Sequence, residues 1–227
     1  MIANNDREGN ANIPSLIVQQ TANGGFINSN SMMEIDDSSS TVFSSSFSYS
    51  DSDTSLHYIQ NETELICCVN GPGELPMAKR INDRLAVSVL YYMENGASTS
   101  SNELQEFANL MIDRSSHPRA GLSINVLQMR DNGSRISAAL NAVSLALLDS
   151  AILFDILFAA AEVALLSDNS IVVNPTKDVE EKAVATALLI FSSIDKELKV
   201  CGFRSRGIIT SDFYCGAVEA AKSAATE

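Results

Sequence analysis

The feature that most restricts the fold of this chain is the stretch DNGSRISAALNAVSLALLD at residues 131–149. An Asp-Asn-Gly turn precedes a segment in which apolar and small side chains occupy nearly every face of a helix. A helix with no polar face cannot lie on a protein surface, because it would expose apolar side chains to water. The sequence therefore predicts a helix over 136–149 that is buried in the centre of the domain, beneath a sheet.

The flanking segments predict a strand-rich domain around this helix. Residues 56–72 are typical of two strands around a turn at 60–63, and residues 183–193 and 198–205 are typical of an antiparallel hairpin. The other predicted elements are strands at 84–93, 120–130 and 169–175 and helices that begin at Ser101 or Asn102, span about 151–162, and follow Thr210 or Ser211. Strands, then helices, then strands and a helix indicate an α+β fold.

Charge is distributed unevenly along the 227 residues. Residues 1–78 hold one basic and ten acidic residues, whereas residues 79–227 hold 14 basic and 18 acidic residues. We interpret residues 1–30 as a flexible N-terminal tail and residues 31–227 as a single domain. The serine-rich segment at about 38–55 predicts a loop with one irregular strand, and an alternative is a phosphorylated acidic segment. The acidic balance argues against an isolated nucleic-acid-binding module.

The cysteines and the N-terminus point to an intracellular protein without metal. Cys67, Cys68, Cys201 and Cys215 form neither a Cys-x-x-Cys pair nor a cluster with histidine, which favours free thiols over a zinc site. The N-terminus has no signal-peptide pattern, and acidic residues interrupt the longest apolar stretch, at 138–166. We expect no membrane span and a location in the nucleus or cytoplasm.

One short motif carries a chemical prediction. Backbone N–H groups at a helix start, with the Ser134 hydroxyl and the Arg135 guanidinium, suit the binding of a phosphate. The alternative is a purely structural turn in which Asp131 or Ser134 caps the helix. The two histidines, His57 and His117, lie in no catalytic motif, and NGPGE at 70–74 reads as a turn. Basic residues within 79–84 and 196–206 are further candidates for contact with a polyanion, or simply solvated charges.

Four segments resemble the RNase PH family. DNGSRISAALNAVSLALLDSAI (131–152) is similar to the family's Gly-Gly-Thr/Ser-Arg turn and the helix signature that follows it. TELICCVNGPGE (63–74), SHPRAGLSINVLQ (116–128) and IVVNPT (171–176) match other family segments in the same order. The resemblance covers about 57–220, and within the family it is strongest to the eukaryotic exosome ring subunits.

This resemblance implies a β-α-β-α fold of the ribosomal-protein-S5-domain-2-like type, with a mixed sheet packed on helices. Active family members hold phosphate with the turn that matches Gly133, Ser134 and Arg135, and they use two aspartates at positions that match Asn174 and Glu180. They also carry arginines in the helix before the YPR-like segment, and residues 94–113 contain none. An amide cannot act as a general acid or as an anionic metal ligand.

The resemblance therefore implies a catalytically silent subunit of the exosome ring that needs no cofactor and no metal. Its expected partners are other RNase PH-like subunits in a hetero-hexameric ring, RNA-binding cap subunits, a hydrolytic nuclease and RNA threaded through the ring. Its expected role is in 3'–5' RNA processing and degradation, including ribosomal RNA maturation, in the nucleus, nucleolus and cytoplasm. The alternative is an active phosphorolytic 3'–5' exoribonuclease that uses Ser134 and Arg135.

Overall fold

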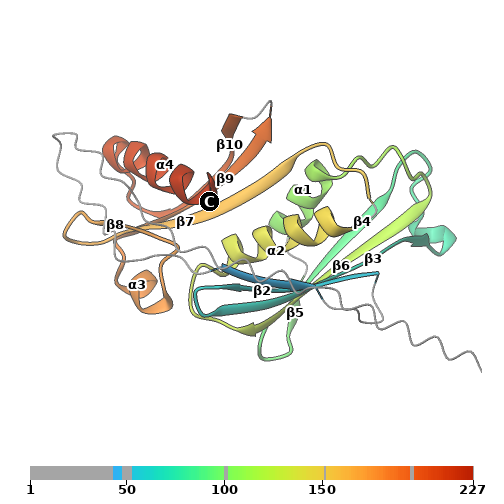
Figure 1. Cartoon of the computed structure of the whole chain (residues 1–227), viewed down its shortest axis with the longest axis horizontal. Helices are drawn as coiled ribbons and strands as arrows, with labels where there is room; N and C mark the ends of the chain where they lie inside the picture. Colours follow the sequence, from blue (N-terminus) through green and yellow to red (C-terminus); the bar gives the residue numbers. More distant parts are fainter. Residues whose placement is uncertain (1–42, 48–52, 100–101, 151, 195–196, 227) are drawn as a thin grey trace, which may run out of the picture.

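Four layers build the molecule in the order sheet, helices, sheet, helix (Figure 1). The computed structural model describes residues 43–47, 53–99, 102–150, 152–194 and 197–226, so the predicted tail at 1–30 lies outside the described residues. Two helices lie between a six-stranded and a four-stranded sheet, and the last helix covers the outer face of the smaller sheet. The α+β class and the β-α-β-α layering predicted from the sequence are confirmed.

The six-stranded sheet has the order β1-β2-β3-β6-β4-β5. Among the described strands of this sheet, β4 and β6 pair in parallel, and the other neighbours are antiparallel. The strands are β1 (Phe43–Phe47), β2 (Thr54–Gln60), β3 (Thr63–Glu74), β4 (Ala86–Tyr92), β5 (Ser98–Thr99) and β6 (Ala120–Arg130), with a short 3-10 helix η1 (Met77–Lys79) between β3 and β4. Within the serine-rich segment, for which one irregular strand is predicted, β1 pairs with β2 along its whole length, and β2 begins at Thr54.

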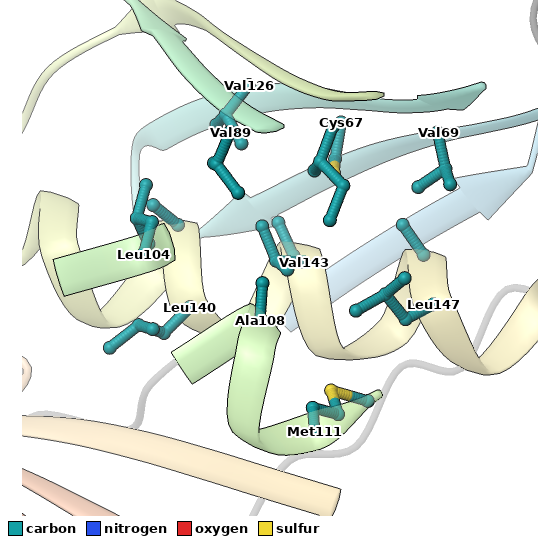
Figure 2. Close-up of a cluster of buried hydrophobic side chains, with 14 of the residues drawn as sticks. Cys67, Val69, Val89, Leu104, Ala108, Met111, Val126, Leu140, Val143 and Leu147 are labelled. Carbon is teal, nitrogen blue, oxygen red and sulfur yellow. The ribbon is translucent and has the colours of Figure 1, made fainter. Parts of the chain in front are cut away.

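Helix α2 (Arg135–Asp149) is the buried central helix that the sequence predicts. It packs on β2 and β3 of the larger sheet and on β7 of the smaller one, while α1 (Asn102–Met111) lies beside it. Figure 2 shows Cys67, Val89 and Val126 of the larger sheet facing Val143 of α2 and Ala108 of α1. Small side chains such as Ala138, Ala142 and Ala146, all without solvent exposure, let both sheets approach the helix closely.

The four-stranded sheet is antiparallel, with the order β10-β9-β7-β8. Its strands are β7 (Leu157–Leu165), β8 (Ile171–Val173), β9 (Ala185–Ile194) and β10 (Glu197–Gly207), with the short helix α3 (Lys177–Lys182) between β8 and β9. Helix α4 (Ser211–Thr226) packs on the face away from α2 and forms a second core around Phe213 and Phe191. The Thr210 hydroxyl accepts the Phe213 N–H at 3.3 Å, as expected of a cap.

The predicted helix at about 151–162 is wrong, because residues 157–162 belong to strand β7 and residues 152–156 form no helix. Both faces of β7 are covered: Phe158 and Ala160 join the α2 core, and Val163 and Leu165 join the α4 core. A strand buried on both faces shows no polar alternation, so its sequence cannot be told from that of a buried helix by periodicity alone. Among the helices that the structure describes, none has the length and apolar character that a membrane crossing requires.

Candidate functional site

The turn between β6 and α2 requires glycine at position 133. Gly133 has φ +91°, and a Cβ atom there would lie 2.5 Å from the carbonyl oxygen of Pro175. Ser134 also has a left-handed backbone, with φ 50° and ψ 31°. The turn is therefore shaped by the segment after β8, against which it packs without space for any side chain at Gly133.

Three successive N–H groups of this turn are occupied by oxygens of the chain itself. The Asn132 N–H donates to Thr63 Oγ1 at 3.0 Å and the Gly133 N–H to Asp131 Oδ1 at 3.3 Å. The Ser134 N–H donates to the Glu180 carboxylate, which comes from α3. Ser134 is the N-cap residue of α2, but no side chain makes a capping hydrogen bond there, so the expectation that the side chain of Asp131 or Ser134 caps the helix is wrong.

The three predicted phosphate ligands, Gly133, Ser134 and Arg135, differ in their exposure to solvent and in their hydrogen bonds. Ser134 is 2% exposed and its hydroxyl donates to the Pro175 carbonyl at 2.9 Å, so it ties the turn to the chain beside it. The Gly133 carbonyl accepts the Thr63 hydroxyl at 2.7 Å. Arg135 alone faces solvent, and within the described part of the chain its guanidinium makes no hydrogen bond or ion pair.

Arg135 lines an open pocket of about 460 Å³ at the N-terminal end of α2. The other lining residues are Met93, Glu94, Asn95, Gln128 and Asp131. Two of these are carboxylates that oppose the binding of a second anion, and the only cation among the lining residues is Arg135. This charge balance is poor for a polyphosphate substrate.

Gln128, one of the residues that line that pocket, is bonded to the buried Tyr91. Gln128 is 7% exposed, and its Oε1 accepts the Tyr91 hydroxyl at 2.8 Å. Burial raises the pKa of Tyr91 to about 12, with Asp131 raising it further and Arg135 lowering it. The phenol therefore stays neutral and keeps its hydrogen bond to Gln128, which is one of the residues that line the pocket.

Asn174 occupies the first position at which the family resemblance implies a catalytic aspartate. It is 2% exposed with φ 49°, a left-handed conformation that Asn tolerates. Its Oδ1 accepts the Glu162 N–H at 3.2 Å, and its carbonyl accepts the Asn61 side chain at 2.9 Å. These bonds join the turn between β2 and β3, strand β7 and the end of β8, so Asn174 has a structural role.

Glu162 on β7 is a buried carboxylate near the turn that the sequence analysis does not select. Burial raises the pKa of Glu162 to about 7, and Glu180 raises it further, while Arg204 and Arg135 lower it. Burial also raises the pKa of Glu180, against the lowering effect of the Ser134 N–H. The signal was a lone glutamate inside the apolar run LFAAAEVALL, where a carboxylate needs a structural or chemical reason.

The remaining predicted candidates lie apart from this site or make local contacts. His57 hydrogen-bonds Glu64 at 2.6 Å, and His117 hydrogen-bonds Ser116 at 2.8 Å. Arg204 pairs with Glu103 of α1 at 2.6 Å on the exposed surface. No group of three or more His, Cys, Asp or Glu side chains in the described residues is arranged to hold a metal ion, and all four cysteines are free.

Residues 42–152 match the RNase PH family described as "3' exoribonuclease family, domain 1". Over this segment, just under half of its length, the chain is therefore similar to the RNase PH family. Among curated proteins it is similar to the exosome complex component RRP46 of Saccharomyces cerevisiae, with 25% identity over 139 residues, 56% of this chain and 62% of the yeast protein. It is also similar to the RRP46 homolog of Caenorhabditis elegans, with 23% identity over 161 residues, 68% of this chain and 74% of that protein.

Solved structures confirm the fold at low identity. The crystal structure of rice (Oryza sativa) Rrp46 superimposes with a TM-score of 0.71 and 18% identity, over 81% of this chain and 89% of the rice chain. The Archaeoglobus fulgidus exosome with RNA bound to the active site contains a chain with a TM-score of 0.63 and 15% identity, over 78% of this chain and 82% of that one. The RNase PH fold predicted from the sequence is therefore confirmed.

Proposed function

We propose that this chain is a non-catalytic subunit of an exosome ring built from RNase PH-like proteins. The family match and the similarity to two RRP46 proteins support a role in an exosome. In this role the domain completes the ring, binds neighbouring subunits and lines part of the RNA path. It thereby supports 3'–5' processing and degradation of RNA without cutting RNA itself.

The observation that carries this proposal is the position of the Asn174 side chain. A phosphorolytic site needs a group that can donate a proton to the leaving oxygen of the RNA, and an amide does not titrate in water. The Asn174 amide is also buried and bonded to the backbone of β7, so it does not reach the pocket beside Arg135. With the Ser134 N–H and hydroxyl both occupied internally, the remaining candidate ligand is Arg135 alone.

The partners follow from this role. We propose other RNase PH-like subunits at the sides of the domain in a hetero-hexamer, RNA-binding cap subunits on the ring, and a hydrolytic nuclease that receives the threaded RNA. The expected locations are the nucleus, including the nucleolus, and the cytoplasm.

A second candidate function is phosphate-dependent 3'–5' exoribonuclease activity. One observation favours it: Arg135 is exposed, lacks a partner in the described residues and lines an open pocket. In that case Arg135 would hold phosphate or the terminal nucleotide, with Ser134 positioning the turn.

An assay of phosphorolysis separates the two functions. The full chain, alone and in its purified ring, is incubated with single-stranded RNA and inorganic phosphate, and nucleoside diphosphates are quantified. We expect none above the level of a ring that contains Arg135→Ala. Release of nucleoside diphosphates that depends on phosphate and is lost with Arg135→Ala would establish the second function instead.

A further inference from the structure

The larger sheet has a partly apolar face that no described helix covers. Helices α1 and α2 both pack on the opposite face, against side chains such as Cys67 and Val126 (Figure 1, Figure 2). Successive residues of a strand point to opposite faces, so Ile66 and Leu127, next in sequence to these two, point away from α2. The partly exposed apolar side chains of this face, which we call the outer strip, are Ile59, Ile66, Leu90, Tyr92 and Leu127.

The outer strip continues from strand to strand because its central members lie opposite one another. Ile66 of β3 pairs with Leu127 of β6, which in turn pairs with Tyr92 of β4. Met129, two residues beyond Leu127, is 50% exposed and extends the apolar surface to the end of β6. An apolar row of this kind gains free energy when a further segment removes it from water.

The described chain enters the larger sheet at the end where the outer strip lies. Phe43, the first described residue, pairs with Gln60 at the end of β2. Strand β3 begins and β6 finishes at this same end, since Gln60 pairs with Thr63 and Glu64 with Arg130. Strand β4 runs parallel to β6 and therefore finishes there too. The chain that precedes Phe43 thus joins the sheet beside the outer strip.

We propose that residues 31–42 turn back from Phe43 across this face and cover the outer strip. The inference goes beyond the proposed function and does not depend on it. The segment, SMMEIDDSSSTV, carries Met32, Met33 and Ile35, and methionine side chains adapt well to an irregular apolar surface. The stretches outside the described ranges that follow Phe43 are at most five residues long, too short to reach across the sheet.

Length and charge both fit this occupant. The path from β1 to β4 crosses four strand spacings, about 19 Å in all. Residues 31–42 span about 40 Å when extended, so the segment has the length to turn at the end of the sheet and cross the strip. It also brings the carboxylates of Glu34, Asp36 and Asp37 to the end of the sheet that holds Arg130. Arg130 is exposed, and its guanidinium makes no hydrogen bond or ion pair within the described part of the chain.

Cys68 reports whether this face is covered. It follows Ile66 by two residues on β3, so it lies on the same face, and it is partly exposed. Cys67 has no solvent exposure, and the substitutions Cys201→Ser and Cys215→Ser remove the two exposed thiols. In the full chain with these two substitutions, the rate of modification by a small maleimide therefore measures access to Cys68.

The test compares two triple variants of the full chain in this background. One combines Met32→Ser, Met33→Ser and Ile35→Ser, which remove the apolar side chains of the proposed cover. The matched control combines Ile13→Ser, Leu16→Ser and Ile17→Ser, which remove three apolar side chains of the same N-terminal region outside residues 31–42. Circular dichroism verifies that both variants fold.

We expect Cys68 to react at least about fivefold faster in the first variant than in the unchanged segment, because loss of the cover opens the face to solvent. The control variant should keep the slow rate. Equal rates in the first variant and the unchanged segment, or the same acceleration in the control, would overturn the inference. A rate that falls as the protein concentration rises would assign the cover to a second copy of the chain and would also overturn it.

A second measurement locates the segment directly. Met33→Cys combined with Met129→Cys should form a disulfide within one chain under mild oxidation, identified by mass spectrometry of the peptides. Met33→Cys combined with Leu153→Cys is the control, because Leu153 is 62% exposed in the connection between α2 and β7. A disulfide in both pairs or in neither pair would contradict the proposed position. Ring partners and RNA cleavage are separate readouts, so these results do not decide the proposed function.

Discussion

Asn174 and Glu162 exchange two hydrogen bonds across the edge of the smaller sheet. The Asn174 N–H donates to the Glu162 carbonyl at 2.6 Å, and Asn174 Oδ1 accepts the Glu162 N–H at 3.2 Å. One residue thus pairs with both backbone groups of Glu162 at the point where β8 ends. The position that the family resemblance assigns to a catalytic aspartate here serves to connect strands.

Replacing Asn174 with alanine should destabilise the fold through two separable effects. Alanine loses the bond to the Glu162 N–H, at a cost of about 1–2 kcal/mol. It also adopts φ 49° unfavourably, at a cost of about 1 kcal/mol. Asn174→Gly loses the bond alone, because glycine tolerates positive φ. Urea unfolding should therefore rank the unchanged chain, Asn174→Gly and Asn174→Ala in order of decreasing stability, and equal stability of all three would contradict this account.

Thr63 should be among the most sensitive polar residues of the domain. It is 1% exposed, and its hydroxyl both accepts the Asn132 N–H at 3.0 Å and donates to the Gly133 carbonyl at 2.7 Å. Thr63→Val keeps the shape but leaves two backbone groups unpaired, for an expected loss of about 2–4 kcal/mol in the free energy of unfolding. Thr63→Ser retains the hydroxyl and should lose less than about 1.5 kcal/mol.

Chemical denaturation of the full chain measures the free energy of unfolding of the Thr63→Val and Thr63→Ser variants. A loss with valine no larger than that with serine would show that the hydroxyl does not hold the turn. A large loss with both variants would instead assign the effect to packing of the missing methyl group.

Glu162 makes the stability of the domain depend on pH. Its pKa in the folded state is about 7, raised by burial above the ordinary value of 4.5. The folded state therefore binds this proton more tightly than the unfolded state, so stability falls as pH rises from about 4.5 to about 7 and stays low above that. This pKa difference corresponds to about 3 kcal/mol, and partial solvent contact reduces the expected effect to about 1–2 kcal/mol.

Glu162→Gln removes this titration and should leave stability near pH 5 close to that of the unchanged chain. At pH 8 the variant should be more stable by about 1–2 kcal/mol, measured by urea unfolding across this range. Glu106→Gln, which removes an exposed carboxylate of α1, is the matched control and should not alter the pH profile. An equal gain at pH 5 and pH 8 would show that Glu162 does not titrate between them.

The helices and strands could be predicted from the sequence wherever the pattern of polar and apolar residues matches their exposed and buried faces. The Asp-Asn-Gly turn marks the start of α2 to within one residue, and alternation identifies β6. Strand β7 could not be predicted, because α2 and α4 cover its two faces and erase the polar alternation that distinguishes a strand. The serine-rich segment predicts one irregular strand without bounds, and the pairing of β1 with β2 supplies those bounds.

Only those residues of the candidate site that are adjacent in the sequence could be predicted. Gly133, Ser134 and Arg135 are adjacent in the chain, so their motif was visible. The hydrogen bond from the Ser134 N–H to Glu180 depends on how α3 packs against the turn, 46 residues away in sequence, and no local pattern encodes it. The sequence places Gln128 in a strand and no more, because the pocket that this residue lines is formed by residues from separate elements.

The central claim is that this domain is a non-catalytic subunit in a ring of RNase PH-like proteins. The most direct test is purification of the tagged full chain from its own cells under gentle salt, followed by identification of the stoichiometric partners by mass spectrometry. We predict several different RNase PH-like chains together with RNA-binding cap subunits and a hydrolytic nuclease. Recovery of the chain without any other RNase PH-like protein would contradict the claim.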